Sequence, residues 1–215
     1  MGGTMTARKQ SAAVAPTDPD GGAASGLAGL EAVARAAGGK GIPPVDQWEP
    51  EFCGDLDIRI ARDGTWFYLG SPIGRKPLVR LFSSVLRKDD DGRTYLVTPV
   101  EKIGIMVEGA PFLAVEMAVE GEGEHRRIGF RTNVDDFVEA DADHPLRFEV
   151  EAESGGLKPY VLVRGRLEAL VVRSVFYDLV ELGEERTVDE TVMFGVWSCG
   201  TFFPMAPADS LAGLR

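Results

Sequence analysis

The sequence has few of the residues that most often carry cross-links, metal ions or catalysis: two cysteines and two histidines among 215 residues. Cys53 and Cys199 lie far apart and neither forms a Cys-x-x-Cys pair, so we expect two reduced, partly buried thiols. His125 and His144 have no second histidine or cysteine at a metal-ligand spacing, which predicts surface histidines. We therefore expect no disulfide, no metal site and no cofactor.

The sequence also lacks long apolar runs and a surplus of basic residues. No stretch approaches the ~20 consecutive apolar residues of a membrane-spanning helix, and the N-terminus has no charged-then-apolar pattern. The 23 lysines and arginines are outnumbered by 34 aspartates and glutamates, giving a net charge of −11. Because nucleic acids and anionic membranes attract basic surfaces, we expect an acidic cytoplasmic protein that binds neither.

Short catalytic motifs are absent as well. The chain has no Gly-rich phosphate loop, no Gly-x-Ser-x-Gly turn, no His-Glu-x-x-His pair and no Gly-x-Gly-x-x-Gly after a predicted strand. The absence of a recognisable nucleophile and base favours a protein that is not an enzyme.

The organisation of the chain is more informative than its motifs. Residues 1–25 are rich in Ala, Gly, Thr and Pro, which predicts a disordered tail because so little apolar surface can be buried. Apolar residues at helical spacing from Leu27 to Ala37 predict a short N-terminal helix. The rest of the chain predicts an α+β protein of two related units, residues 26–109 and 110–215.

Each unit is expected to contain an antiparallel-rich sheet and one amphipathic helix. Helical spacing of apolar residues predicts these helices over Leu78–Leu86 and Leu167–Leu182. The glycines that precede them, Gly74 and Gly165, are 91 residues apart. The same separation relates two glycines within similar apolar segments, Gly104 and Gly195. Equal separations indicate a duplicated unit and predict a ligand groove between the halves, although two unrelated helices could match by coincidence.

One predicted hairpin gathers charged and aromatic residues. Strand alternation places Asp55, Asp57 and Arg59 on one face, where two carboxylates and a guanidinium could orient a polar ligand or share a metal. The alternative is an ordinary polar sheet face with cross-strand ion pairs. Trp66, on the returning strand, forms either a pocket wall or part of the core.

Two arginines occupy matching positions in the proposed duplication. Arg75 and Arg166 open the two predicted helices, where the helix dipole disfavours a cation, so each needs an acidic partner or an anionic ligand. Trp197 lies in the apolar segment that contains Gly195. The candidate ligand-binding residues are therefore Asp55, Asp57, Arg59, Arg62, Trp66, Arg75, Arg166 and Trp197.

Several long segments resemble one bacterial family. The segments Ile42–Pro50, Cys53–Tyr68, Ser71–Arg75, Phe130–Asn133 and Tyr160–Arg166 are similar to the proteobacterial family designated domain of unknown function 1285 (DUF1285), with nearly everything after residue 25 covered. The resemblance implies a two-part α+β fold with repeated motifs, a second part similar to a pleckstrin-homology-like module, and a place in signal transduction. It implies no enzymatic activity.

Three functions remain open at the level of sequence. The first is a ligand-binding or regulatory module that takes a small molecule or a protein. The second is a hydrolase or metal-assisted enzyme that uses Asp55 and Asp57, with His125 as a further candidate. The third is a structural homodimer formed through a sheet edge or an exposed aromatic surface.

Overall fold

A computed structural model describes residues 31–32, 35, 41–152 and 155–211. The tail predicted for residues 1–25 lies outside the described residues, as does most of the helix predicted from Leu27 to Ala37. Of that segment, Glu31, Ala32 and Arg35 are described and are helical.

The N-terminal unit is a six-stranded sheet with strand order β3-β2-β1-β6-β5-β4. Its strands, in chain order, are β1 (Phe52–Ile60), β2 (Trp66–Tyr68), β3 (Ser71–Pro72), β4 (Leu86–Lys88), β5 (Thr94–Val97) and β6 (Lys102–Val107). Helix α2 (Lys76–Ser84) connects β3 to β4. Trp66 and Phe82 stack between sheet and helix, with ring centroids 6.4 Å apart, so both lie in the core.

The C-terminal unit repeats this topology in a second six-stranded sheet, with order β10-β11-β12-β7-β8-β9. Its strands are β7 (Phe112–Glu120), β8 (Arg127–Thr132), β9 (Phe137–Glu139), β10 (Leu146–Val150), β11 (Leu157–Arg164) and β12 (Leu167–Val171). Each sheet consists of two antiparallel three-stranded meanders joined by a central parallel pair, β1 with β6 and β7 with β12. The predicted α+β fold with two related units is confirmed.

The register of the duplication differs from the predicted one. The sheets begin at Phe52 and Phe112, and their second meanders begin at Leu86 and Leu146, so each pair is separated by 60 residues rather than 91. Gly165 does not precede a helix, because it lies in the turn between β11 and β12. The separation of 91 residues between Gly74 and Gly165 is therefore a coincidence of sequence.

The helix predicted over Leu167–Leu182 is also wrong in its first part. Residues Leu167–Val171 form β12, in which buried and half-buried side chains alternate, and the helix α3 comprises only Arg173–Glu181. The apolar spacing of Leu167, Leu170 and Val171 fits a helix as well as a strand, and pairing of β12 with β7 and β11 decides the outcome.

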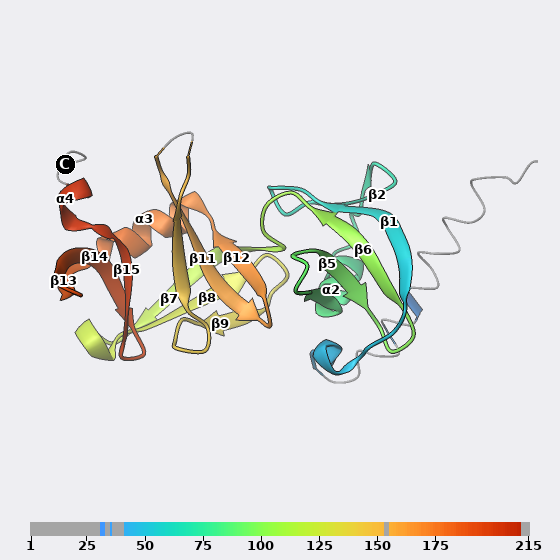
Figure 1. The fold of residues 1–215 in the computed structure, drawn as a ribbon, viewed down its shortest axis with the longest axis horizontal. Helices are drawn as coiled ribbons and strands as arrows, with labels where there is room; N and C mark the ends of the chain where they lie inside the picture. Colours follow the sequence, from blue (N-terminus) through green and yellow to red (C-terminus); the bar gives the residue numbers. More distant parts are fainter. Residues whose placement is uncertain (1–30, 33–34, 36–40, 153–154, 212–215) are drawn as a thin grey trace, which may run out of the picture.

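A third, smaller sheet follows α3. It comprises β13 (Glu184–Val188), β14 (Thr191–Ser198) and β15 (Thr201–Pro207), and leads into the short helix α4 (Ala208–Leu211). Gly195 lies in β14 of this sheet, whereas Gly104 lies in β6 of the first sheet, so these two glycines are not equivalent either. Figure 1 shows the two six-stranded units side by side, with the third sheet and α4 at the far end of the C-terminal unit.

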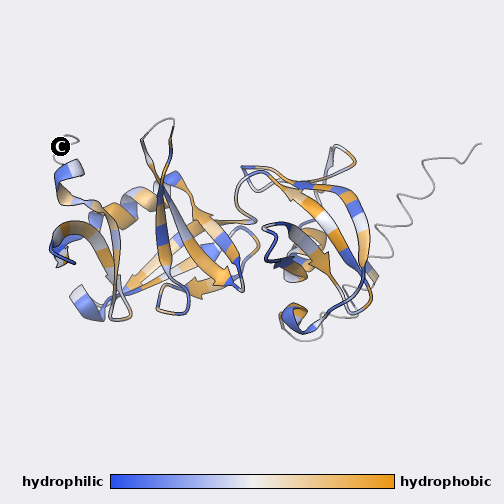
Figure 2. Ribbon diagram, viewed as in Figure 1, coloured by the Kyte–Doolittle hydropathy of each residue, from blue (hydrophilic) through white to orange (hydrophobic). Residues whose placement is uncertain are grey.

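Polar contacts and packing connect the two six-stranded units. Arg164 of β11 donates to the carbonyl oxygen of Ser83 in α2, at 2.6 Å. Arg80 of α2 pairs with Asp135, and Arg166 pairs with Asp90. The buried apolar residues of both units form one continuous cluster, and Figure 2 shows apolar and polar residues alternating along the strands around it. Within the described ranges, no helix has the length and apolar character needed to cross a membrane.

Candidate functional site

Asp55, Asp57 and Arg59 all lie on β1, and two of them have protein partners. Asp55 is ion-paired with Arg93, and the hydrogen bond that Arg93 donates raises the pKa of its guanidinium. Arg59 donates to Glu108 Oε1 at 2.5 Å and lies over the Phe67 ring at 4.2 Å. This arrangement matches the polar sheet face that the sequence left as an alternative.

The two tryptophans lie in different sheets. Trp66 is 1% exposed and belongs to the core of the N-terminal unit, so it forms no pocket wall. Trp197 is buried in β14, packs edge-on against Phe202 at 5.4 Å, and is covered by Arg186 at 4.3 Å.

The remaining candidate arginines are dispersed. Arg75 is exposed before α2, with its guanidinium 3.8 Å from Glu31 Oε1. Arg62 is exposed in the β1–β2 turn, and Arg166 reaches Asp90 of the other unit. The structure therefore brings Asp55, Asp57 and Arg59 onto one strand but does not assemble the eight candidates in one cleft.

The cysteines and the metal-ligating residue types form no cluster either. Cys53 and Cys199 are free and exposed, so the prediction of partial burial is wrong. Cys199 is exposed because it occupies the β14–β15 turn, with a positive φ of 50°. Among the described residues, no three His, Cys, Asp or Glu side chains are grouped so that they could hold a metal ion.

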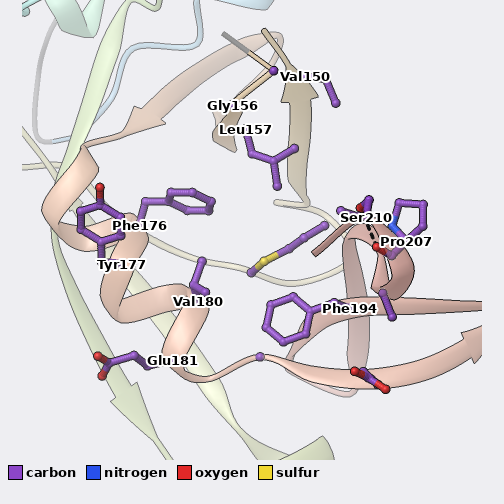
Figure 3. A pocket seen from close by; sticks show the side chains of 16 residues that line it. Val150, Gly156, Leu157, Phe176, Tyr177, Val180, Glu181, Phe194, Pro207 and Ser210 are labelled. Atoms are coloured by element: carbon purple, nitrogen blue, oxygen red, sulfur yellow. Dashed lines mark hydrogen bonds between the residues drawn. The ribbon is translucent and has the colours of Figure 1, made fainter. Parts of the chain in front are cut away.

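A hollow lies between α3 and the third sheet, at the end of the C-terminal unit away from the N-terminal unit. Its volume is about 1070 Å³, and its sixteen lining residues come from α3 and the glycine after it, the facing ends of β10 and β11 with part of their loop, the third sheet and α4 (Figure 3). We call it the α3 groove. Its main apolar residues are Leu157, Phe176, Tyr177, Val180, Phe194 and Met205.

Local contacts fix the aromatic residues of the α3 groove. Phe176 packs against Phe148 of β10, with ring centroids 6.5 Å apart. The hydroxyl of Tyr177 accepts a hydrogen bond of 2.8 Å from Arg173 Nε one turn earlier in α3. Gly183, after the helix, lets the ring of Phe194 lie against the backbone, because a Cβ at this position would overlap the ring.

The charged side chains that line the α3 groove are of one sign. Among the sixteen described residues that line it, Glu181 and Glu185 are the charged ones, and none is basic. In Figure 3 the carboxylate of Glu181 lies at the edge and points away from the apolar side chains. The groove therefore has an apolar interior and an acidic rim, which suits an apolar group next to a cation.

The groove was missed by the sequence analysis, although α3 carried a usable signal. Val175 and Leu179 form its buried face, at the i, i+4 spacing expected of a single apolar stripe. Phe176, Tyr177 and Val180 form a second apolar stripe, and Tyr177 is 55% exposed. A nine-residue helix with two apolar faces needs a second apolar partner, and here the second face borders the groove.

Comparisons with known proteins agree on one family. Residues 43–110 match the model of the "Domain of unknown function (DUF1285), N-terminal domain", and residues 111–205 match "Protein of unknown function (DUF1285), C-terminal domain". These matches confirm the resemblance noted in the sequence. No curated protein matches the chain.

Two solved structures are similar to this chain. A DUF1285 family protein from Silicibacter pomeroyi DSS-3 is 49% identical, with a TM-score of 0.77, over 85% of this chain and 97% of that one. A DUF1285 family protein from Shewanella baltica OS155 is 26% identical, with a TM-score of 0.46, over 59% of this chain and 91% of that one.

Proposed function

The chain belongs to the DUF1285 family, and we propose that it acts as a ligand-binding or regulatory module in the cytoplasm, with the α3 groove as its binding site. The observation that carries the proposal is the groove itself: a hollow of about 1070 Å³ whose interior is formed by apolar side chains. Concave apolar sites with a few polar groups at their edges are typical of ligand sites. The two free, exposed cysteines are compatible with a reducing compartment.

Exposure of large apolar side chains at the groove supports the same proposal. Val150 and Tyr177 are 64% and 55% exposed, and they line the groove together with the half-buried Phe176, Val180 and Phe194. Keeping such side chains in water is unfavourable by roughly 25 cal/mol for each Å² of apolar surface. Apolar surface of this kind gains free energy when a ligand covers it.

The proposal is tested with Nile red, a neutral apolar dye whose fluorescence rises when it leaves water. We expect saturable binding to the full-length protein. The substitution Val180→Asp introduces a charge into the apolar interior and should weaken binding at least tenfold, since an unpaired charge is costly to bury. Tyr177→Asp, at a more exposed position, should also weaken dye binding and should disturb the fold less.

The matched control is Val100→Asp, because Val100 is 65% exposed in a loop of the N-terminal unit. This variant should bind the dye as the wild type does, and circular dichroism should show all variants folded. Dye binding that is unchanged in both Val180→Asp and Tyr177→Asp would overturn the assignment of the site. A positive result can be followed by a thermal-shift screen, because a ligand that binds the native state raises its apparent stability.

A further inference from the structure

We infer that the occupant of the α3 groove is a cationic amphipathic helix of a partner protein. This inference rests on the proposed function, because it assigns a partner to the same groove. It specifies the charge and the shape of the partner, which the apolar interior alone does not determine. The size, the side chains and the charge of the groove each bear on the identity of the partner.

The groove is large enough to take a polypeptide segment. Small-molecule pockets commonly measure about 300–1,000 Å³, and the α3 groove, at about 1070 Å³, lies at the upper end of that range. Its lining extends from Val150 and Leu157 at one end to Glu181 at the other (Figure 3). A helix that binds through anchors at i, i+3, i+4 and i+7 presents an apolar stripe about 10 Å long, which suits an elongated groove.

The apolar side chains of the groove are of the types that accept helical anchors. Phe176 and Phe194 offer aromatic surfaces from opposite sides, one from α3 and the other from β14. Met205, on β15, contributes an unbranched side chain that can adapt to different guests. Aromatic residues and methionine are enriched in protein–protein interfaces for these reasons.

The charge of the groove indicates which sign of charge the partner carries. Its charged lining residues, Glu181 and Glu185, are both acidic, and the whole chain carries a net charge of −11. Like-charge repulsion disfavours fatty acids, phosphorylated ligands and a second copy of this chain. Lysines or arginines beside the apolar anchors of a helix would instead meet Glu181 and Glu185. Because carboxylates at the rim remain hydrated, each such pair adds only modest affinity, and the preference for a cationic helix should weaken as the salt concentration rises.

The inference is tested with three synthetic helical peptides of equal length and identical leucine faces. Their polar faces carry lysine, glutamine or glutamate, and binding to the full-length protein is followed by fluorescence anisotropy. We expect the lysine peptide to bind at least tenfold more tightly than the glutamate peptide at low salt, with a smaller difference at 0.5 M salt. It should also displace Nile red.

The double variant Glu181→Lys/Glu185→Lys tests the two carboxylates directly. It should lose at least fivefold in affinity for the lysine peptide while retaining its affinity for the glutamine peptide. The control double variant, Glu51→Lys/Asp57→Lys, makes the same change in net charge at exposed positions of the N-terminal unit. It should change the affinity for the lysine peptide less than twofold.

Several outcomes would overturn the inference. The inference is wrong if the lysine and glutamine peptides bind equally well, or if the two double variants lose the same affinity for the lysine peptide. It is also wrong if dodecylamine, a cation with a single alkyl chain, displaces Nile red as well as the lysine peptide does, or if self-association of the protein prevents the dye from binding. If Nile red still binds in a manner sensitive to Val180→Asp, the cationic helix is wrong and the groove remains a binding site. If the dye does not bind there either, the proposed function also falls.

Discussion

Arg164 of the C-terminal unit donates a hydrogen bond from Nη2 to the carbonyl oxygen of Ser83 in the N-terminal unit, at 2.6 Å. Ser83 lies at the end of α2, where carbonyl groups lack helical partners and a nearby cation is favourable. The same guanidinium donates from Nη1 to Asp136 at 2.6 Å and lies over the ring of Phe112 at 4.9 Å. One side chain thus joins the end of a helix in one unit to a loop and a strand of the other.

We expect Arg164→Ala to destabilise the protein by about 2–4 kcal/mol, because it leaves Asp136 and the Ser83 carbonyl without a charged partner in a largely buried place. Urea unfolding monitored by fluorescence measures the change. The control is Arg127→Ala, which removes the exposed pair between Arg127 and Glu139. That control should lose no more than about 1 kcal/mol. Equal losses in the two variants would show that Arg164 does not join the units.

Gly104 and Gly195, which the sequence analysis paired, should respond differently to alanine. A Cβ at Gly104 would collide with the Asp55 carboxylate and approach Arg93 Nη2 at 2.7 Å, and both of these side-chain groups can move. A Cβ at Gly195 would collide with the Phe203 carbonyl oxygen and lie 2.9 Å from the Pro204 Cα, which are backbone atoms of the paired strand. We expect losses in unfolding free energy of under about 1 kcal/mol for Gly104→Ala and about 2–4 kcal/mol for Gly195→Ala.

Thermal denaturation of the two glycine variants, followed by circular dichroism, measures this difference. Similar melting temperatures would contradict it, because the structure places an ion pair of exposed side chains against Gly104 and backbone atoms against Gly195.

These glycines also show how far the sequence could predict the fold. The alternation in β1 and the helical spacing of α2 are local patterns, and both elements were found. The separation of 91 residues was misleading, because it matched a helix start at Gly74 with a hairpin turn at Gly165. The true separation of 60 residues appears only when the pairing of β1 with β6 and of β7 with β12 is known. Such long-range pairing leaves little trace in a single sequence.

The candidate site was less predictable than the fold for a related reason. The charged residues of β1 were correctly placed on one strand, but their partners Arg93 and Glu108 are 38 and 49 residues away in sequence. The α3 groove arises where α3 meets the third sheet, so Phe176 and Phe194 become neighbours of one hollow only in the folded chain. The one local signal of the groove is the second apolar stripe of α3, and the sequence analysis did not pick it out.

Asp89 should make the stability of the protein depend on pH in the acid range. Burial acts to raise the pKa of Asp89, but hydrogen bonds from Arg87 at 2.6 Å and Lys102 at 3.0 Å outweigh it and hold the pKa below its ordinary value. A carboxyl whose pKa is lowered by folding stabilises the protein above its unfolded pKa of about 3.9. That stabilisation is lost as the pH falls through the folded pKa.

We therefore expect Asp89→Asn to reduce the unfolding free energy by about 1–3 kcal/mol at pH 7, and the gap from the wild type to narrow below about pH 4. Urea unfolding between pH 7 and pH 3 gives both curves. Asp57→Asn, at an exposed position of β1, serves as the control and should leave the unfolding free energy at pH 7 close to that of the wild type. A gap for Asp89→Asn that stays constant down to pH 3 would contradict the assigned ion pairs.

Trp66 provides a last prediction, which separates a core residue from a ligand-binding one. It is 1% exposed, it stacks on Phe82, and its indole Nε1 has no hydrogen-bond partner in the part of the chain that the structure describes. Trp66→Ala should destabilise the protein by about 3–5 kcal/mol, because it removes a large buried ring and leaves a cavity. Trp66→Phe keeps a ring against Phe82 and removes the buried donor. Its loss of unfolding free energy should therefore be less than half that of Trp66→Ala.

Folded Trp66→Phe protein should also bind Nile red with the affinity of the wild type, because Trp66 lies in the N-terminal unit and the α3 groove in the C-terminal unit. Denaturant unfolding and the dye titration therefore give independent measurements of the same variant. Loss of dye binding at unchanged stability would return Trp66 to the set of ligand-binding residues. A loss of stability as large as that of Trp66→Ala would show that the indole makes a contact that a phenyl ring cannot replace.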